Sequence, residues 1–411
     1  MTQFWLGGYG ADMGGDAAGI GVLAGDEGRE PTTLAYRGGA ASAASPSWLA
    51  AHPTLDVVYA ALEGEGTVQA FRRTGEVSLT ALGGPVEAGS GVCHVAVAPS
   101  GGHLVASCYG DGRVVRIDLA ADGSPTSATV AASASDPYDR DAQDAEDSAR
   151  PSAQEIAAAM LRRGSMVVDE EKLDEPVAEP PRSGLLLFDE MLGLNAAPEQ
   201  APDPAVEEDS ASRASHAHAA AFLPDGRIAT TDLGFDLVRI WRAGRTGLVE
   251  DHRVVLPQGV GPRHMVVHPS GHLHVVTEYS CEVFTLAAGP DGRWTLAAAT
   301  TVSPAVRVGE DFPSELSRSR DGQTLYAGVR GSDTIAALRV RGDGSQVESF
   351  ALAESGVEWP RHHLVHDGAL LVAGQRSDEI SVLDLDERTG APRGIRHRTT
   401  APAPTRILLA R

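Results

Sequence analysis

The 411-residue sequence predicts an all-β protein, a single seven-bladed β-propeller interrupted by one acidic insertion. Three observations predict this fold. A pattern of strands and turns recurs about every 45–50 residues, the two ends of the chain hold complementary parts of it, and one long stretch lacks it. A repeat of this length is typical of a four-stranded propeller blade.

Six copies of the repeat follow one another along the chain. Each has a short apolar strand, a turn such as Pro-Ser-Gly, a second apolar strand, a polar tip and a third strand. Short apolar runs bounded by Gly and Pro are typical of buried strands. The copies begin at Pro46, Cys93, His218, Arg263, Ser314 and Arg361.

A seventh copy is divided between the two ends. The segment from Phe4 has the pattern of a second and third strand, and the segment from Pro404 has that of a first strand. We expect the C-terminal strand to complete the N-terminal blade, because this closes the ring and leaves no free sheet edge. The propeller is therefore assigned to residues 1–120 and 213–411.

The remaining residues, 121–212, are predicted to form an acidic insertion between blades. They include 21 acidic and 6 basic residues, a charge of −15 out of the total −22. Such a segment buries too little apolar surface to offset its ordering entropy, so we expect it to be partly disordered, with helices at most over 152–163 and 183–194. It could act as a lid or dock a protein partner.

The charge and the cysteine content limit the function classes. A net charge of −22 disfavours nucleic acid and an anionic membrane surface as partners. Three cysteines do not make a disulfide framework. The first residues lack the pattern of a signal peptide, and no apolar run is long enough to span a bilayer. These features predict a cytoplasmic protein.

The repeat also predicts which residues share one face of the ring. The first two strands of a blade form a hairpin, so the start of the first lies beside the end of the second. These open ends gather at one mouth of the central channel, where we expect a ligand. The second strands end at Tyr9, Glu63, Tyr109, Asp232, Glu278, Arg330 and Gln375.

Three consecutive blades supply the candidate catalytic residues. A carboxylate between two guanidiniums is ionised, and guanidiniums offer paired donors to an anion or an oxyanion. The candidate catalytic residues are His218, Arg263, Glu278 and Arg330. The candidate substrate-binding residues are His94, Tyr109, Asp232, Arg361 and Gln375.

Several motifs in this order resemble the bacterial lactonase family of seven-bladed propellers, which includes cycloisomerase-type 6-phosphogluconolactonases. The fungal 3-carboxy-cis,cis-muconate lactonizing enzymes are similar to it. The motifs include GSGVCHVAVAPSG from Gly89, HAHAAAFLPDGR from His216 and GVGPRHMVVHPSG from Gly259. The resemblance implies that His218, Arg263, Glu278 and Arg330 form the active site. The sequence departs from the family at Cys108, Thr277 and Val329, where the family has Asn.

The resemblance implies a lactone hydrolase, similar to 6-phosphogluconolactonase, that acts on a small anionic sugar lactone. Glu278 would be the general base, Arg263 and Arg330 would hold the anion and the oxyanion, and His218 would protonate the leaving oxygen. A carboxymuconate cycloisomerase and a non-enzymatic binding protein remain alternatives. We expect no cofactor, and no metal because the Arg side chains repel cations.

Overall fold

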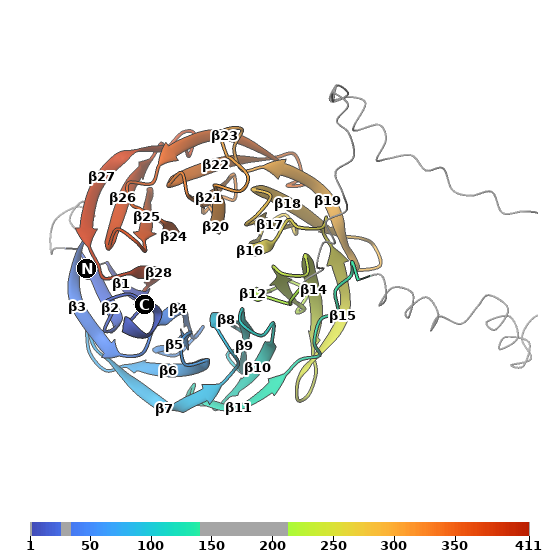
Figure 1. Ribbon diagram of the computed structural model, residues 1–411. Helices are drawn as coiled ribbons and strands as arrows, with labels where there is room; N and C mark the ends of the chain where they lie inside the picture. Colours follow the sequence, from blue (N-terminus) through green and yellow to red (C-terminus); the bar gives the residue numbers. More distant parts are fainter. Residues whose placement is uncertain (1, 26–33, 140–212, 411) are drawn as a thin grey trace, which may run out of the picture. The chain divides into compact units, whose positions relative to one another are not determined.

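The computed structural model describes residues 2–25, 34–139 and 213–410. Within these ranges, the strands form seven four-stranded antiparallel sheets arranged as a ring around a central axis (Figure 1). The predicted seven-bladed propeller is confirmed. A single short 3-10 helix, Ala11–Met13, is the helical element of the described part, and no helix there is long and apolar enough to cross a membrane.

We number the blades from 1 to 7 and give their strands from the channel outwards. Blade 1 holds β28 (Pro404–Leu409), β1 (Gln3–Gly8), β2 (Gly19–Ala24) and β3 (Ala35–Ser42). Blade 2 holds β4 (Pro46–Ala51), β5 (Val57–Leu62), β6 (Thr67–Arg73) and β7 (Leu79–Glu87). Blade 3 holds β8 (Val92–Val97), β9 (His103–Cys108), β10 (Val114–Leu119) and β11 (Pro125–Val130). Blade 4 holds β12 (Ala217–Phe222), β13 (Ile228–Asp232), β14 (Leu237–Ala243) and β15 (Leu248–Val255).

The remaining three blades follow in chain order. Blade 5 holds β16 (Pro262–Val267), β17 (Leu273–Thr277), β18 (Glu282–Ala288) and β19 (Trp294–Thr301). Blade 6 holds β20 (Phe312–Arg318), β21 (Thr324–Arg330), β22 (Thr334–Arg341) and β23 (Gln346–Glu354). Blade 7 holds β24 (Pro360–His366), β25 (Ala369–Gly374), β26 (Glu379–Leu385) and β27 (Pro392–Thr400).

Blade 1 is built from both ends of the chain, as the divided repeat predicts. The C-terminal strand β28 pairs antiparallel with β1, with Phe4 opposite Leu409 and Leu6 opposite Ile407. β28 is the innermost strand of this blade, like β4 and β8 in the next two. The ring is therefore closed by backbone hydrogen bonds between the two ends of the chain.

The structure moves one predicted boundary. β11 pairs with β10 as the outermost strand of blade 3, so the propeller continues beyond residue 120. This outermost strand is mostly exposed, so it does not need large apolar side chains, and the sequence of residues 125–130 has few of them. The rest of the predicted insertion, residues 140–212 with both predicted helices, lies outside the described residues.

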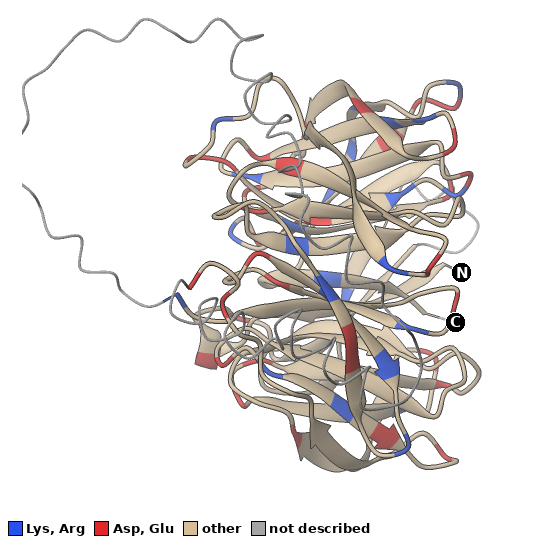
Figure 2. Cartoon of the chain, turned by 90° about the vertical axis from the view of Figure 1, so that its right-hand side faces the viewer, with Lys and Arg blue, Asp and Glu red and all other residues tan. Residues whose placement is uncertain are grey.

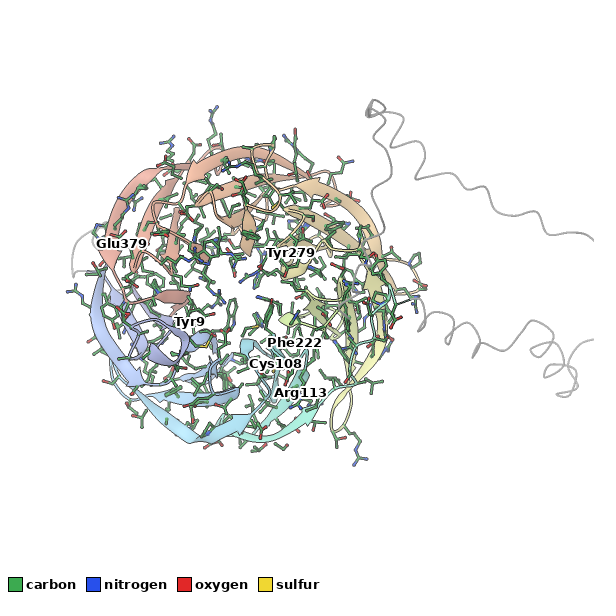
Figure 3. The ribbon with its side chains drawn as sticks, in the orientation of Figure 1. Tyr9, Cys108, Arg113, Phe222, Tyr279 and Glu379 are labelled. Atoms are coloured by element: carbon green, nitrogen blue, oxygen red, sulfur yellow. The ribbon has the colours of Figure 1, made fainter. Side chains whose placement is uncertain are left out.

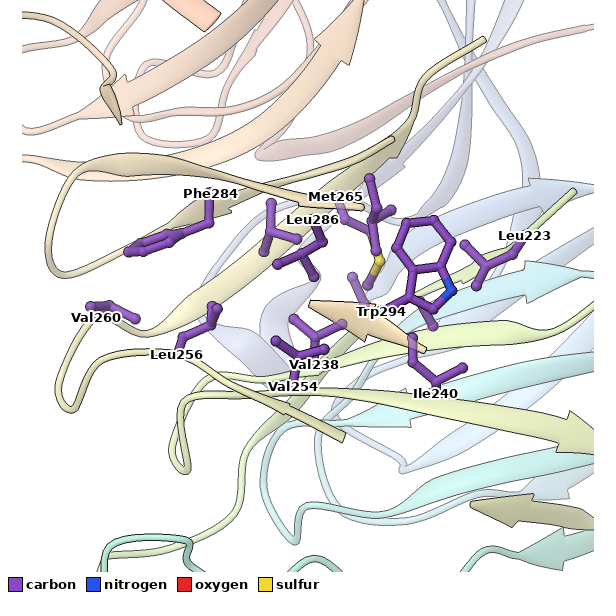
Figure 4. Packing of buried hydrophobic residues seen from close by; sticks show 14 residues of the cluster. Leu223, Val238, Ile240, Val254, Leu256, Val260, Met265, Phe284, Leu286 and Trp294 are labelled. Carbon is purple, nitrogen blue, oxygen red and sulfur yellow. The ribbon is translucent and has the colours of Figure 1, made fainter. Parts of the chain in front are cut away.

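Blades pack face to face, which explains the continuous apolar runs of the middle strands. Every residue of β5 and of β25 is buried, because both faces of these strands are covered by neighbouring blades. Figure 4 shows the core between blades 4 and 5, where Trp294 and Met265 pack near Ile240 and Leu286. Many charged residues lie instead in the loops at the ends of the blades (Figure 2).

Candidate active site at one mouth of the channel

The strand register brings the predicted residues to the same mouth. In blade 6, Phe312 at the start of β20 lies opposite Arg330 at the end of β21. In blade 5, Pro262 lies opposite Thr277, the residue before Glu278. The hairpins therefore open towards one mouth, as the repeat predicts.

Arg263, Glu278 and Arg330 form a compact ion-paired cluster at this mouth. Oε2 of Glu278 lies 2.7 Å from Nε of Arg263 and 2.8 Å from Nη2 of Arg330. Both guanidiniums are also fixed by the backbone of blade 6. Nη1 of Arg263 donates to the carbonyl of Ser314 at 2.5 Å, and Nε of Arg330 donates to the carbonyl of Phe312 at 3.0 Å.

These contacts set the charge states of the cluster. Burial raises the pKa of Glu278, but Arg263 and Arg330 outweigh burial and bring the pKa below its usual value. Burial and the charge of Arg263 lower the pKa of Arg330 to about 9. At neutral pH the cluster therefore holds one carboxylate and two guanidiniums, which leaves one net positive charge for an anionic ligand.

Arg361 lies on the blade 7 side of the mouth. Its Nη1 donates to Oε1 of Gln375 at 3.4 Å, and its guanidinium lies 5.0 Å from the ring centre of Tyr9. Among the described residues it has no ion pair within 4.0 Å, in contrast to Arg263 and Arg330. Burial lowers the pKa of Arg361, but neighbouring groups, Tyr9, Glu63 and Glu278 among them, together raise it above its usual value, so the side chain stays charged.

The predicted histidines are buried and neutral. Burial, followed by the charges of Arg263 and Arg361, holds the pKa of His218 well below 6.5. Burial and His264 do the same to the pKa of His94. If His218 protonates the leaving oxygen, as predicted, the proton would therefore not come from an imidazolium that is populated at neutral pH. Its Nδ1 is buried and has no hydrogen-bond partner in the described part of the chain.

Tyr109 and Asp232 occupy different environments. Tyr109 is 38% exposed and stacks on His216, with ring centres 4.4 Å apart. Asp232 is 2% exposed, and its Oδ1 accepts hydrogen bonds from the backbone N–H of His216 and of Phe235. Ser215 donates to its other oxygen. These contacts give Asp232 a structural role, and we leave it out of the proposed substrate-binding set.

The repeat places Tyr9 and Glu63 at this mouth, but neither was selected as a candidate site residue, and Tyr279 was missed. The Tyr9 hydroxyl donates to Glu63, with 3.2 Å to Oε2 and 3.3 Å to Oε1. Tyr279 packs against Gly261, where a Cβ atom would lie 2.6 Å from its ring. Figure 3 shows Tyr9 and Tyr279 on opposite sides of the central opening. Glu63 shares its repeat position with Glu278, and this signal could have identified it.

A second polar cluster is built from the residues one position further along the inner strands. Glu315 is 4% exposed and lies 3.5 Å from Nε2 of His264 and 3.6 Å from Nε2 of His362. Burial raises the pKa of Glu315 to about 8, against a smaller opposing effect of Arg406. His94 belongs to this cluster, since its ring lies 4.3 Å from that of Trp48, which also contacts His264 and His362.

Within the described ranges, no three His, Cys, Asp or Glu side chains are arranged to hold a metal ion. The expectation that the protein needs no metal stays a prediction.

Comparison with known proteins gives a family and a fold. A family model described as "Lactonase, 7-bladed beta-propeller" matches residues 3–150 and 195–409. An uncharacterized protein of Lactococcus lactis subsp. cremoris is 29% identical over 184 residues, 43% of this chain and 53% of that protein. The chain thus spans about half the length of the curated relatives it matches.

Two solved structures illustrate the structural likeness. The periplasmic gluconolactonase PpgL of Pseudomonas aeruginosa has a TM-score of 0.70 at 18% identity, over 100% of this chain and 99% of that one. A proposed 6-phosphogluconolactonase of Bacteroides fragilis has a TM-score of 0.73 at 18% identity, over 100% and 98%. At this identity the likeness shows the fold alone.

Proposed function

This chain belongs to the lactonase family of seven-bladed β-propellers, and from this premise we propose that it hydrolyses a small anionic sugar lactone. The observation that carries the proposal is the group of three guanidiniums, from Arg263, Arg330 and Arg361, at one mouth of the channel of an acidic protein. Desolvated guanidiniums bind carboxylate and phosphate groups strongly and stabilise negative charge that develops during a reaction.

The two ion-paired guanidiniums suit the oxyanion of the reaction. Arg263 and Arg330 are held by Glu278 and by the backbone of blade 6, so their positions are set before a substrate binds. Donors fixed in this way stabilise the tetrahedral oxyanion that forms when water attacks the lactone carbonyl.

Arg361 suits the anionic substituent of the substrate. Among the described residues it has no carboxylate partner within ion-pair distance, and it donates one long hydrogen bond, to the neutral Gln375. A phosphate or carboxylate would provide the missing counter-charge. The buried, neutral His218 can donate a hydrogen bond to the lactone ring oxygen, but it carries no imidazolium proton at neutral pH.

The leading substrate candidate is 6-phosphoglucono-1,5-lactone. It carries both groups that the mouth fits, a lactone carbonyl and a phosphate. The relative described as a proposed 6-phosphogluconolactonase is consistent with this choice. The cytoplasmic location stays a prediction, and one structural relative is described as periplasmic.

The test uses the purified full chain with two lactones, one phosphorylated and one not. Proton release from 6-phosphoglucono-1,5-lactone and from glucono-1,5-lactone is followed with a pH indicator, with and without a chelator. We expect release above the spontaneous rate, with a higher kcat/KM for the phosphorylated lactone. No release above the spontaneous rate with either lactone would contradict the proposal for sugar lactones. Consumption of a carboxymuconate instead would favour the cycloisomerase.

A further inference from the structure

Two carboxylates lie at the mouth of the channel, on opposite sides of the ring. Glu63 follows β5 in blade 2, and Glu278 follows β17 in blade 5. Blades three positions apart are as far apart as a seven-membered ring allows, and Figure 1 shows β5 and β17 across the channel from each other. The two residues have equivalent places in their hairpins, so both face the same mouth.

The surroundings of Glu278 make it a poor proton acceptor. Arg263 and Arg330 both contact its Oε2, and together they lower its pKa despite burial. A general base becomes less efficient as its pKa falls below the working pH. A proton placed on Glu278 would also weaken the ion pairs that hold the two guanidiniums in place.

The surroundings of Glu63 are different. Within the described ranges, its two carboxylate oxygens share a single donor, the Tyr9 hydroxyl, at 3.2 and 3.3 Å. No ion pair of Glu63 occurs among the described residues. Burial is the main cause that raises the pKa of Tyr9, so Tyr9 stays protonated and remains a donor. Because a carboxylate has about four acceptor sites, Glu63 can also accept a hydrogen bond from a water molecule.

Both carboxylates affect the pKa of the same cationic side chain, Arg361. Burial lowers the pKa of Arg361, and Tyr9, Glu63 and Glu278 are among the groups that raise it. Arg361 is thus within electrostatic reach of both carboxylates. Tyr9 connects the two sides, since its hydroxyl donates to Glu63 and its ring centre lies 5.0 Å from the guanidinium of Arg361, so a substrate whose anionic group binds Arg361 would lie near Glu63.

We propose that Glu63 is the general base of the lactonase reaction and that Glu278 is a positioning residue for Arg263 and Arg330. The inference rests on the proposed function. Glu63 takes a proton from water while the water oxygen bonds to the lactone carbonyl carbon, and the carbonyl becomes an oxyanion beside Arg263 and Arg330. When the carbonyl re-forms, the bond to the ring oxygen breaks and this oxygen receives the proton from Glu63. The new carboxylic acid then loses its proton to solvent.

The test compares Glu63→Gln with Glu65→Gln, a matched change at an exposed position of the same turn. Initial rates of lactone hydrolysis are measured against pH, and folding is checked by thermal unfolding. We expect Glu63→Gln to lower kcat by roughly 10²–10⁴-fold with little change in KM, and to abolish the acid limb of the pH–rate profile. Glu65→Gln should behave like the wild type.

A second variant, Tyr9→Phe, tests the same role without removing the carboxylate. Loss of the donor to Glu63 makes the charged form of the base less stable, so the acid limb should move to higher pH. This variant decides the question if Glu63→Gln does not fold.

The outcomes separate this inference from the proposed function. If the wild type hydrolyses the lactone and Glu63→Gln keeps its kcat and its acid limb, Glu63 is not the base although the lactonase assignment stands. An unmoved acid limb in Tyr9→Phe has the same meaning. If the wild type hydrolyses no lactone, the proposed function and this inference fail together.

Discussion

Nε of Arg263 lies 2.7 Å from Oε2 of Glu278, so the start of β16 is joined to the end of β17 across the open end of one hairpin. Arg330 reaches the same oxygen from the neighbouring blade. One carboxylate oxygen therefore fixes the spacing of two guanidiniums that come from different blades. Several expected outcomes depend on this arrangement.

Replacement of Glu278 by Gln should destabilise the protein. The change leaves two buried guanidiniums without their counter-charge, which costs about 3 kcal/mol in typical buried pairs. Urea unfolding measures the loss. Glu310→Gln is the control, because Glu310 and its partner Arg307 are largely exposed and such pairs contribute at most about 1 kcal/mol. Equal effects of the two changes would argue against a structural role for the Glu278 charge.

The same variant should respond more strongly to added phosphate than the wild type. An anion that enters the mouth can replace the lost carboxylate and stabilise the folded state by binding only to it. Unfolding midpoints are compared with phosphate and with chloride at equal ionic strength. An identical effect of phosphate on both proteins would show that the anion does not replace the lost carboxylate.

Replacement of Arg361 by Gln should reduce the preference for a phosphorylated lactone. A hydrogen bond to a charged group contributes about 1.5–3 kcal/mol, so kcat/KM for 6-phosphoglucono-1,5-lactone should fall roughly 10- to 150-fold. The value for glucono-1,5-lactone should change little, since this substrate has no anion for Arg361 to bind. Parallel losses for both lactones would show that Arg361 acts elsewhere in the reaction.

The buried carboxyl of Glu315 should make stability depend on pH. Burial raises its folded-state pKa to about 8, above the usual 4.5. Between these values the folded state holds a proton that the unfolded state has released, so this contribution to stability decreases as pH rises. Urea unfolding of wild type and Glu315→Gln from about pH 5 to about pH 8 isolates it, because His264, His362 and Arg406 are common to both proteins. We expect the free energy of unfolding of the wild type to decline relative to the variant, and a constant difference would contradict the buried neutral state.

Closure of the ring should depend on the inner face of β28. Ile407 is fully buried and pairs with Leu6, whereas Leu409 on the same strand is 39% exposed. Ile407→Ala should cost about 2–5 kcal/mol, as for other large-to-small changes in a core. Leu409→Ala should cost much less. Chemical unfolding compares the two, and similar losses would indicate that β28 is not packed as described.

The repeat predicted the fold and the faces of the strands well, for a physical reason. Side chains alternate between the faces of a strand, so a fixed distance from each turn places equivalent residues at equivalent sites. This register correctly brought Arg263, Glu278 and Arg330 to one mouth. It also placed β28 in blade 1, because only a first strand was missing there.

The sequence could not predict the protonation states and hydrogen-bond partners of individual side chains. The low pKa of His218 follows from its burial beside Arg263 and Arg361, which arise from other blades. Asp232 occupies the predicted position, but local donors of its own blade satisfy it. The outermost strand over residues 125–130 was not predicted, because such strands are exposed and their sequences lack an apolar pattern.

The central claim is that the mouth lined by arginines hydrolyses an anionic lactone, and one measurement tests it most directly. Initial rates of proton release from 6-phosphoglucono-1,5-lactone are compared for the wild type, for Arg263→Met with Arg330→Met, and for Arg320→Ala with Arg388→Ala. The last pair changes two exposed arginines in turns at the opposite end of the blades. We predict wild-type rates for this control and a loss of at least about 10²-fold for the mouth variant, as for removal of oxyanion donors. A folded mouth variant that hydrolyses the lactone as fast as the wild type would contradict the claim.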